Sequence, residues 1–132
     1  MPFLDCTCVK GETRGFSSII EVTNDNGVSF EPLDLNEYSV KFQVLGAPVA
    51  DAEVLLEKII TQNTNLSDTG QIDDPDNGSF TFTVSADDTN LLGLGKFPIR
   101  IVLLDAVTLD EVFTLTQGAE NGEYNKIYIV QV

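Results

Sequence analysis

Apolar and polar side chains alternate strictly along two segments of the chain. In residues 38–44 a tyrosine, two valines and a phenylalanine fall on one face, and in residues 79–84 two phenylalanines and a valine do the same. Successive side chains of a β-strand point to opposite faces of a sheet. This spacing therefore predicts two strands, each with one face in a core and the other in water.

Six further strands are predicted around these two segments. They span residues 3–9, 16–23, 53–61, 96–104, 111–117 and 126–132. The intervening segments are predicted turns and loops, most of them rich in Asn, Asp, Gly or Pro: residues 24–27, 28–36, 46–52, 62–78, 105–109 and 118–125. One short strand near residues 71–72 is expected within the long loop of residues 62–77.

Two of these strands carry conflicting signals. Residues 53–61 fit a short helix as well as a strand, and we predict a strand because the neighbouring segments are strands. The strand at 96–104 becomes apolar on both faces toward its end, which predicts a central position. Pro98 lacks a backbone N–H and is therefore expected at an edge or a bulge.

One helical turn is predicted at residues 85–92. Ser85 is suited to cap the first free N–H groups, and Asp88 three residues later resembles the second half of a capping box. Gly93 is suited to end the helix. About seven to nine short strands and this single turn predict an all-β, antiparallel β-sandwich.

The chain has 132 residues, which is enough for one domain, 1–132, with its own core. Residues 1–9 are expected to form an N-terminal arm or edge strand, and residues 119–132 to contain the C-terminal strand. Large apolar side chains of the strands are expected to build the core: Phe42, Phe80, Phe82, Phe97, Ile99, Ile101, Phe113 and Leu115.

Acidic residues dominate the charge. The chain carries 21 Asp and Glu against 7 Lys and Arg, a formal net charge of −14 at pH 7. Nucleic acids and anionic membranes both require clustered basic side chains, so neither is an expected partner. The acidity favours either simple solubility or a basic partner surface. No apolar run approaches a membrane span, and the first residues lack a signal-peptide pattern, so synthesis in the cytoplasm is expected.

Cys6 and Cys8 stand two residues apart, so in a strand their side chains share one face. Neighbours of this kind do not readily form a disulfide, and two thiolates do not complete a zinc site, which needs four ligands. Both cysteines are expected to be reduced, small apolar side chains.

Candidate catalytic chemistry is sparse. The chain contains no His, which removes the commonest general base and metal ligand. No serine lies in a nucleophile-elbow pattern, and neighbouring carboxylates such as Asp87 and Asp88 are expected by chance among 21 acids. We therefore predict no enzymatic activity and no cofactor. The three tyrosines, Tyr38, Tyr124 and Tyr128, are scattered and do not predict a sugar-binding platform.

The segment 73–78 is the best candidate for a metal site. Its closely spaced oxygen ligands suit Ca²⁺, which prefers about six to eight oxygens; they are Asp73, Asp74, Asp76 and Asn77. The segment lacks the final Glu and the flanking helices of an EF-hand. Asp and Asn before Gly are also what an ordinary hairpin turn needs. We predict a turn here, with a calcium site as the alternative.

Several short motifs form a series along the chain: KGET at 10–13, NG at 26–27, YSVKFQV at 38–44, DNGSFTF at 76–82, DTNLL at 88–92, GKF at 95–97 and FTLTQG at 113–118. The series resembles the small Ig-like β-sandwich domains of tailed-phage virion proteins, such as the N-terminal domain of baseplate upper proteins and related head and tail accessory proteins. The resemblance covers residues 10–118. The chain departs from the pattern in its longer loop at 62–77, its cysteine-containing start and the strand after Gly118.

The resemblance implies an Ig-like sandwich without catalytic residues, present in many copies in a virion. The leading expectation is a capsid decoration or cement protein that docks onto the major capsid protein and forms a homo-oligomer. A tail or baseplate adaptor, bound to a tail or baseplate protein, is the alternative. Residues before 10 and after 118 are the expected contact elements. A rival of another class is a calcium-dependent or glycan-binding adhesin module that uses the loop at 62–77.

Overall fold

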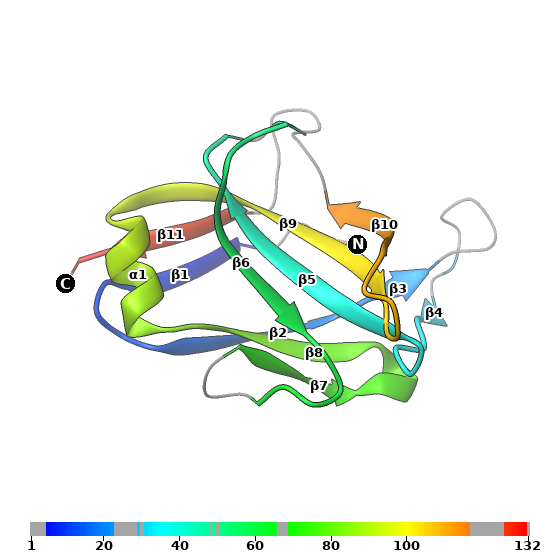
Figure 1. Cartoon of the computed structure of the whole chain (residues 1–132). Helices are drawn as coiled ribbons and strands as arrows, with labels where there is room; N and C mark the ends of the chain where they lie inside the picture. Colours follow the sequence, from blue (N-terminus) through cyan, green and yellow to red (C-terminus); the bar gives the residue numbers. More distant parts are fainter. Residues whose placement is uncertain are drawn as a thin grey trace.

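The computed structural model describes residues 5–22, 29, 31–47, 49, 51–65, 69–116 and 126–131. They form two layers of β-strands with one α-helix at one end (Figure 1). The strands are β1 (Asp5–Val9), β2 (Arg14–Ile19), β3 (Glu21–Val22), β4 (Glu31–Pro32), β5 (Tyr38–Leu45), β6 (Val54–Ile60), β7 (Gly70–Asp74), β8 (Ser79–Val84), β9 (Gly95–Asp105), β10 (Glu111–Thr116) and β11 (Lys126–Val130). The helices are α1 (Ala86–Leu92) and one 3₁₀ turn, η1 (Pro75–Asn77).

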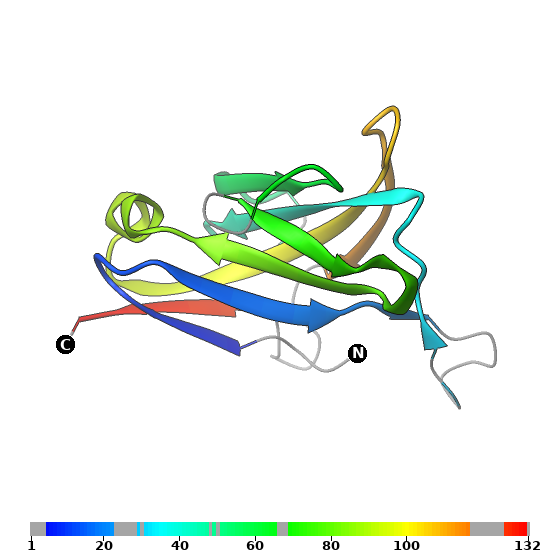
Figure 2. The same ribbon diagram turned by 90° about the horizontal axis from the view of Figure 1, so that it is seen from below.

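The strands pair into two sheets and a short ribbon. The larger sheet has the order β1-β11-β9-β5-β6, with β10 also paired to β9, and the smaller sheet has the order β2-β8-β7. Figure 2 shows the smaller sheet from below, in front of the larger one. Variable-type immunoglobulin sandwiches pair strands B, E and D in one sheet and G, F, C and C′ in the other. The chain has this order, so the expected all-β, Ig-like sandwich is confirmed.

Two details of the strands differ from expectation. The described residues hold more strands than predicted, because the segment at 16–23 divides at Ile20 and the segment at 31–32 pairs with its second half. Ile20 lies outside the ladder: its N–H donates to the Gly78 carbonyl, and its carbonyl accepts from the Leu33 N–H. The sandwich is also not wholly antiparallel, since β1 crosses to the larger sheet and runs parallel to β11.

Phenylalanine rings fill the space between the sheets. Phe42 of β5 stacks on Phe82 of β8, with 4.2 Å between ring centroids and an interplanar angle of 16°. Phe16 and Phe80 pack beside Phe82, at 5.5 Å and 6.3 Å. Among the predicted core residues, Ile99 and Ile101 are also buried and Phe97 is partly buried. The side chains of Phe113 and Leu115 lie outside the described residues.

The prediction that β5 and β8 each turn one face to water is wrong. Ser39 and Gln43 of β5 are buried, as are Thr81 and Thr83 of β8, although they point away from the core. Both strands are central in their sheets, so long polar side chains from the strands beside them cover these positions. Gln43, for example, donates to Glu57 of β6 and accepts from Arg100 of β9.

The two cysteines lie as the sequence predicts. Cys6 and Cys8 of β1 form no disulfide in the described part of the chain, and both are buried in the core, on one face of the strand. Burial raises the pKa of the Cys8 thiol to about 11, against the opposing charge of Arg14. The thiol is therefore protonated at neutral pH and poorly reactive.

Helix α1 has the predicted capping box. The Asp88 backbone N–H donates to Ser85 Oγ (3.2 Å), and the Ser85 backbone N–H donates to Asp88 Oδ2 (2.8 Å). The helix ends at Gly93, whose φ of 78° lies in the left-handed region. Asp88 also forms a salt bridge with Lys58 of β6, which ties the helix to the larger sheet.

Stability is expected to fall in acid partly through Asp88. Burial raises the pKa of its carboxyl group, but the hydrogen bonds from Lys58 and Ser85 outweigh burial and hold the pKa below the ordinary value of 3.8. A lowered folded-state pKa gives stability that is present above the unfolded pKa and is lost as the pH falls through the folded one. Urea unfolding between about pH 5 and pH 3 should therefore show a shallower pH dependence for Asp88→Asn than for the wild type.

The matched control for this experiment is Asp87→Asn, an exposed neighbour on the same helical turn. This variant should keep the slope of the wild type. A slope that is unchanged in the Asp88→Asn protein would contradict the assigned role of the Lys58–Asp88 pair.

The remaining predictions have mixed outcomes. Residues 54–60 form a strand, as predicted, and Pro98 lies where the ladder of β9 with β11 ends and the ladder with β5 begins. The hairpin loop predicted at 105–109 joins β9 to β10. The strand predicted near 71–72 extends over the whole of β7. The turns predicted at 24–27 and 118–125 lie outside the described residues.

Candidate docking surface

The four candidate calcium ligands lie at the end of β7 and in η1, with separate partners. Asp73 accepts hydrogen bonds from Gln71 (2.6 Å) and from the Thr81 hydroxyl. Asn77 donates to Asp74 (2.8 Å). Asp76 accepts from the side-chain amide of Asn36 (2.7 Å), which also donates to Asp34.

The turn predicted at this segment is present as η1 followed by Gly78, whose φ is 70°. Within the part of the chain that the structure describes, no three or more Asp, Glu or Cys side chains are grouped so that they would hold a metal ion. The carboxylates of the segment are each held by a neighbouring donor instead of converging on one point. No helix among the described residues is long and apolar enough to cross a membrane.

The loop between β9 and β10, residues 105–110, is held by a dense set of hydrogen bonds. Asp105 Oδ1 accepts from the backbone N–H groups of Thr108 (3.0 Å) and Val107 (2.8 Å), and these bonds lower the pKa of its carboxyl group. The backbone N–H of Leu109 donates to the Asp105 carbonyl (2.9 Å). The base of the loop is fixed to the residue that precedes β5, because the Ala106 N–H donates to the Glu37 carbonyl (3.1 Å).

This ordered loop presents apolar side chains to solvent. Val107 is 92% exposed and Leu109 is 44% exposed. Leu109 has a φ of 60°, and among the described residues it is the only one other than glycine with a positive φ. A left-handed conformation costs an ordinary side chain about 1–2 kcal/mol. The loop therefore holds one strained residue while it exposes two apolar side chains, and strained residues are concentrated at functional sites.

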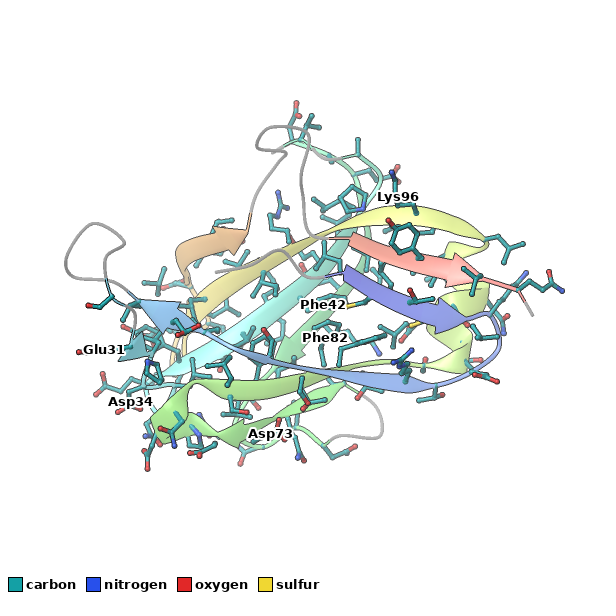
Figure 3. All side chains as sticks on the ribbon, turned by 180° about the vertical axis from the view of Figure 1, so that it is seen from behind. Glu31, Asp34, Phe42, Asp73, Phe82 and Lys96 are labelled. Atoms are coloured by element: carbon teal, nitrogen blue, oxygen red, sulfur yellow. The ribbon has the colours of Figure 1, made fainter. Side chains whose placement is uncertain are left out.

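Acidic side chains surround the loop. Backbone hydrogen bonds join residues 20 to 33 and 78, 35 to 75, and 37 to 106, so these segments lie at one end of the sandwich. The segments 19–22, 31–37, 74–78 and 105–110 contain no Lys or Arg. Their acids are Glu21, Glu31, Asp34, Glu37, Asp74, Asp76, Asp105 and Asp110. We call this end, with the loop, the hairpin pole; Figure 3 shows Glu31 and Asp34 there, away from Lys96.

The other end of the sandwich also exposes apolar side chains but has a different charge. Leu91 of α1 is 69% exposed and Leu94 is 53% exposed. They lie near the start of β9, whose Lys96 pairs with Tyr128 of β11, and near Lys10, whose N–H donates to the Val130 carbonyl. Basic residues are thus present at this helix pole, in contrast to the hairpin pole.

The central cations on the outer face of the larger sheet have partners within the molecule. Lys41 of β5 pairs with Glu111 of β10 and lies 4.0 Å from Glu57 of β6. The hydrogen bond from Lys41 lowers the pKa of the Glu111 carboxyl group. Arg100 donates to Gln43 (2.8 Å), which bonds Glu57 in turn. The central cations of this face are therefore engaged within the molecule.

The other predicted surface residues are dispersed. Tyr38 begins β5 opposite Asp105 at the hairpin pole, while Tyr128 lies opposite Lys96 toward the helix pole. Tyr124 lies outside the described residues. The terminal strands, expected as contact elements, pair with each other, and β11 is paired on both sides.

Sequence reasoning missed the exposed hairpin loop, whose signal is two large apolar residues in a segment where turns are normally polar.

No family model and no curated protein matches the chain. Among solved structures, the chain is similar to the NK cell receptor Nkp44, described as a triggering partner in natural cytotoxicity. The identity is 15%, the TM-score is 0.47, and the alignment covers 100% of both chains. No function is transferred at this level of similarity, and the fold assignment rests on the strand order of the chain itself.

Proposed function

We propose that this chain is a non-enzymatic structural component of a tailed-phage virion, a capsid decoration or cement protein that docks onto the major capsid protein. The observation that carries the docking role is the hairpin loop at 105–110, which is ordered internally and exposes Val107 and Leu109. The series of motifs that resembles phage virion Ig-like domains supports the assignment to a virion. A tail or baseplate adaptor is the alternative location.

The chemistry of the chain supports binding over catalysis. The sequence contains no His, and the described residues hold no metal-ligand cluster. Burial raises the pKa of the Cys8 thiol to about 11 and so keeps it protonated at neutral pH. These features favour a role in contact with a partner over a role in catalysis.

The side chains of the loop and of the segments beside it indicate what kind of partner surface would bind there. An exposed Val107 at the tip of an ordered loop suits a shallow apolar socket, because a preorganised loop loses little conformational entropy on binding. The surrounding acids of the hairpin pole suit a rim of Lys and Arg side chains on the partner. The net charge of −14 would accelerate association with such a surface at low ionic strength.

Quantitative mass spectrometry of purified phage particles tests the proposal. We expect the chain in many copies, in a whole-number ratio to the protein on which it sits, because virion shells and tails are symmetric. Separate analysis of heads and tails distinguishes decoration from adaptor. Particles that lack the chain would overturn the proposal.

Light scattering of the purified chain with and without millimolar Ca²⁺ is a second test. A closed oligomer that does not depend on Ca²⁺ agrees with a component of a symmetric particle. A monomer whose melting temperature rises with Ca²⁺ would favour the adhesin module instead.

A further inference from the structure

β6 is the last strand of the larger sheet, paired to β5 on one side and to no strand among the described residues on the other (Figure 1). The free edge of such a strand presents a row of N–H and C=O groups at the spacing of a β-ladder. The chemical group that matches such a row is another extended backbone.

The other strand edges of the described structure carry features that discourage pairing. β10 has two register shifts and β7 has one, which interrupt a regular edge. The guanidinium group of Arg14 donates a hydrogen bond to the Thr7 carbonyl of β1 (2.7 Å), so this carbonyl is not available to an added strand. β2 is regular, but the exposed charge of Arg14 lies at its start.

β6 has fewer of these protections. Its sequence, VLLEKII, contains no Gly or Pro, and its register with β5 shifts once, at Leu55, and is regular from Leu56 to Ile60. A lysine on an edge strand ordinarily discourages pairing. Here Lys58 points toward the helix and pairs with Asp88, so its charge does not discourage another strand from pairing with this edge.

The side chains on the two faces of β6 indicate which side chains an added strand should have. Glu57 lies on the outer face opposite Gln43, from which it accepts a hydrogen bond, and Ile59 shares that face. Val54 lies opposite Leu45 on the same face, beyond the register shift, while Leu56 packs against the core. The Glu57 side chain is 45% exposed, Val54 is 39% exposed, and Ile59 is half-buried. A strand with one basic side chain between two apolar ones on its outer face complements this row.

We propose that β6 accepts an extended segment of a different protein as an added strand, with a Lys or Arg of that segment opposite Glu57. This inference is independent of the hairpin docking proposed above and uses another surface. A second copy of the chain is a poor occupant, because antiparallel pairing along all of β6 places Glu57 opposite Glu57. The net charge of −14 on each copy adds to that repulsion.

The test uses a blocked seven-residue peptide in which Thr and Val alternate around a central Lys, titrated into the isotopically labelled full chain. The peptide matches the length of β6 and places Val, Lys, Val on one face. We expect saturable amide shifts along 54–60 and slower hydrogen exchange there. A peptide with Glu in place of Lys should bind roughly fivefold more weakly.

Two controls separate strand addition from general attraction to an acidic protein. N-methylation of alternate peptide residues removes the N–H groups of one edge and should abolish binding if the contact is a ladder. Glu57→Lys should reverse the preference between the Lys and Glu peptides, whereas Glu12→Lys, the same charge change at an exposed turn, should not. Glu57→Gln replaces Glu57→Lys if the latter does not fold, and should remove the preference.

Absence of saturable shifts in β6, or binding that N-methylation does not alter, would overturn the proposal. Shifts centred on another edge strand would also overturn it. None of these results would bear on the hairpin loop, so the two proposals fail separately.

Discussion

Alanine in place of Gly70 is expected to remove most of the stability of the protein. Gly70 begins β7 with a φ of +132°, and a Cβ at this position would lie 2.2 Å from the Thr81 carbonyl oxygen and 2.9 Å from Phe82 Cα. Both are backbone atoms of β8, so they cannot move without breaking the smaller sheet. We expect a loss of more than about 4 kcal/mol, from a total that is typically 5–15 kcal/mol. Urea unfolding followed by circular dichroism measures it.

Gly93→Ala is the matched control for this substitution. Gly93 also has a positive φ, 78°, but a Cβ added there would meet open space, with no neighbouring side chain or strand within 4 Å. The control should lose less, about 1–3 kcal/mol, the cost of placing an ordinary residue in a backbone conformation (φ 78°, ψ −178°) that glycine alone adopts readily. Equal losses in the two variants would contradict the close approach of β7 and β8.

Phe82→Ala is expected to cost about 3–5 kcal/mol, the range for loss of a buried aromatic ring. The side chain of Phe82 is fully buried, and its ring contacts those of Phe42, Phe16 and Phe80. Its removal leaves a cavity where the two sheets meet, because rings from both sheets pack around it. The midpoint of urea unfolding, compared with that of the wild type, measures the change.

Leu91→Ala is the control for the loss of a large apolar side chain. Leu91 is 69% exposed on α1, so its truncation should change the stability by no more than about 0.5 kcal/mol. A loss below about 1.5 kcal/mol for Phe82→Ala would contradict the position of this ring at the centre of the core.

Local patterns in the sequence predicted the elements whose signal is contained within one segment. The alternation at 38–44 and 79–84 predicted β5 and β8 with bounds close to those observed, because a strand pattern needs only its own residues. The capping box at Ser85 and Asp88 was predictable for the same reason. At 53–61 composition alone was ambiguous, and the choice of a strand depended on the neighbouring segments.

The features that the sequence did not predict depend on residues far apart in the chain. The polar faces of β5 and β8 are buried because Glu57, Arg100 and Asp73 arrive from other strands. The parallel pairing of β1 and β11 joins the two ends of the chain, and no local pattern encodes it. The acids at 73–76 are close together in the sequence, which made them candidates for one site. In the fold each of them forms hydrogen bonds with a different partner.

Under the proposed role in a virion, co-sedimentation of the purified chain with phage particles that lack it tests docking through the hairpin loop most directly. Val107→Asp should weaken binding by about thirtyfold, the equivalent of ~2 kcal/mol for a central contact residue. Leu91→Asp, which places the same charge on an exposed apolar residue at the helix pole, should bind like the wild type. Full binding by the Val107→Asp protein, or an equal loss in both variants, would contradict docking through the hairpin loop.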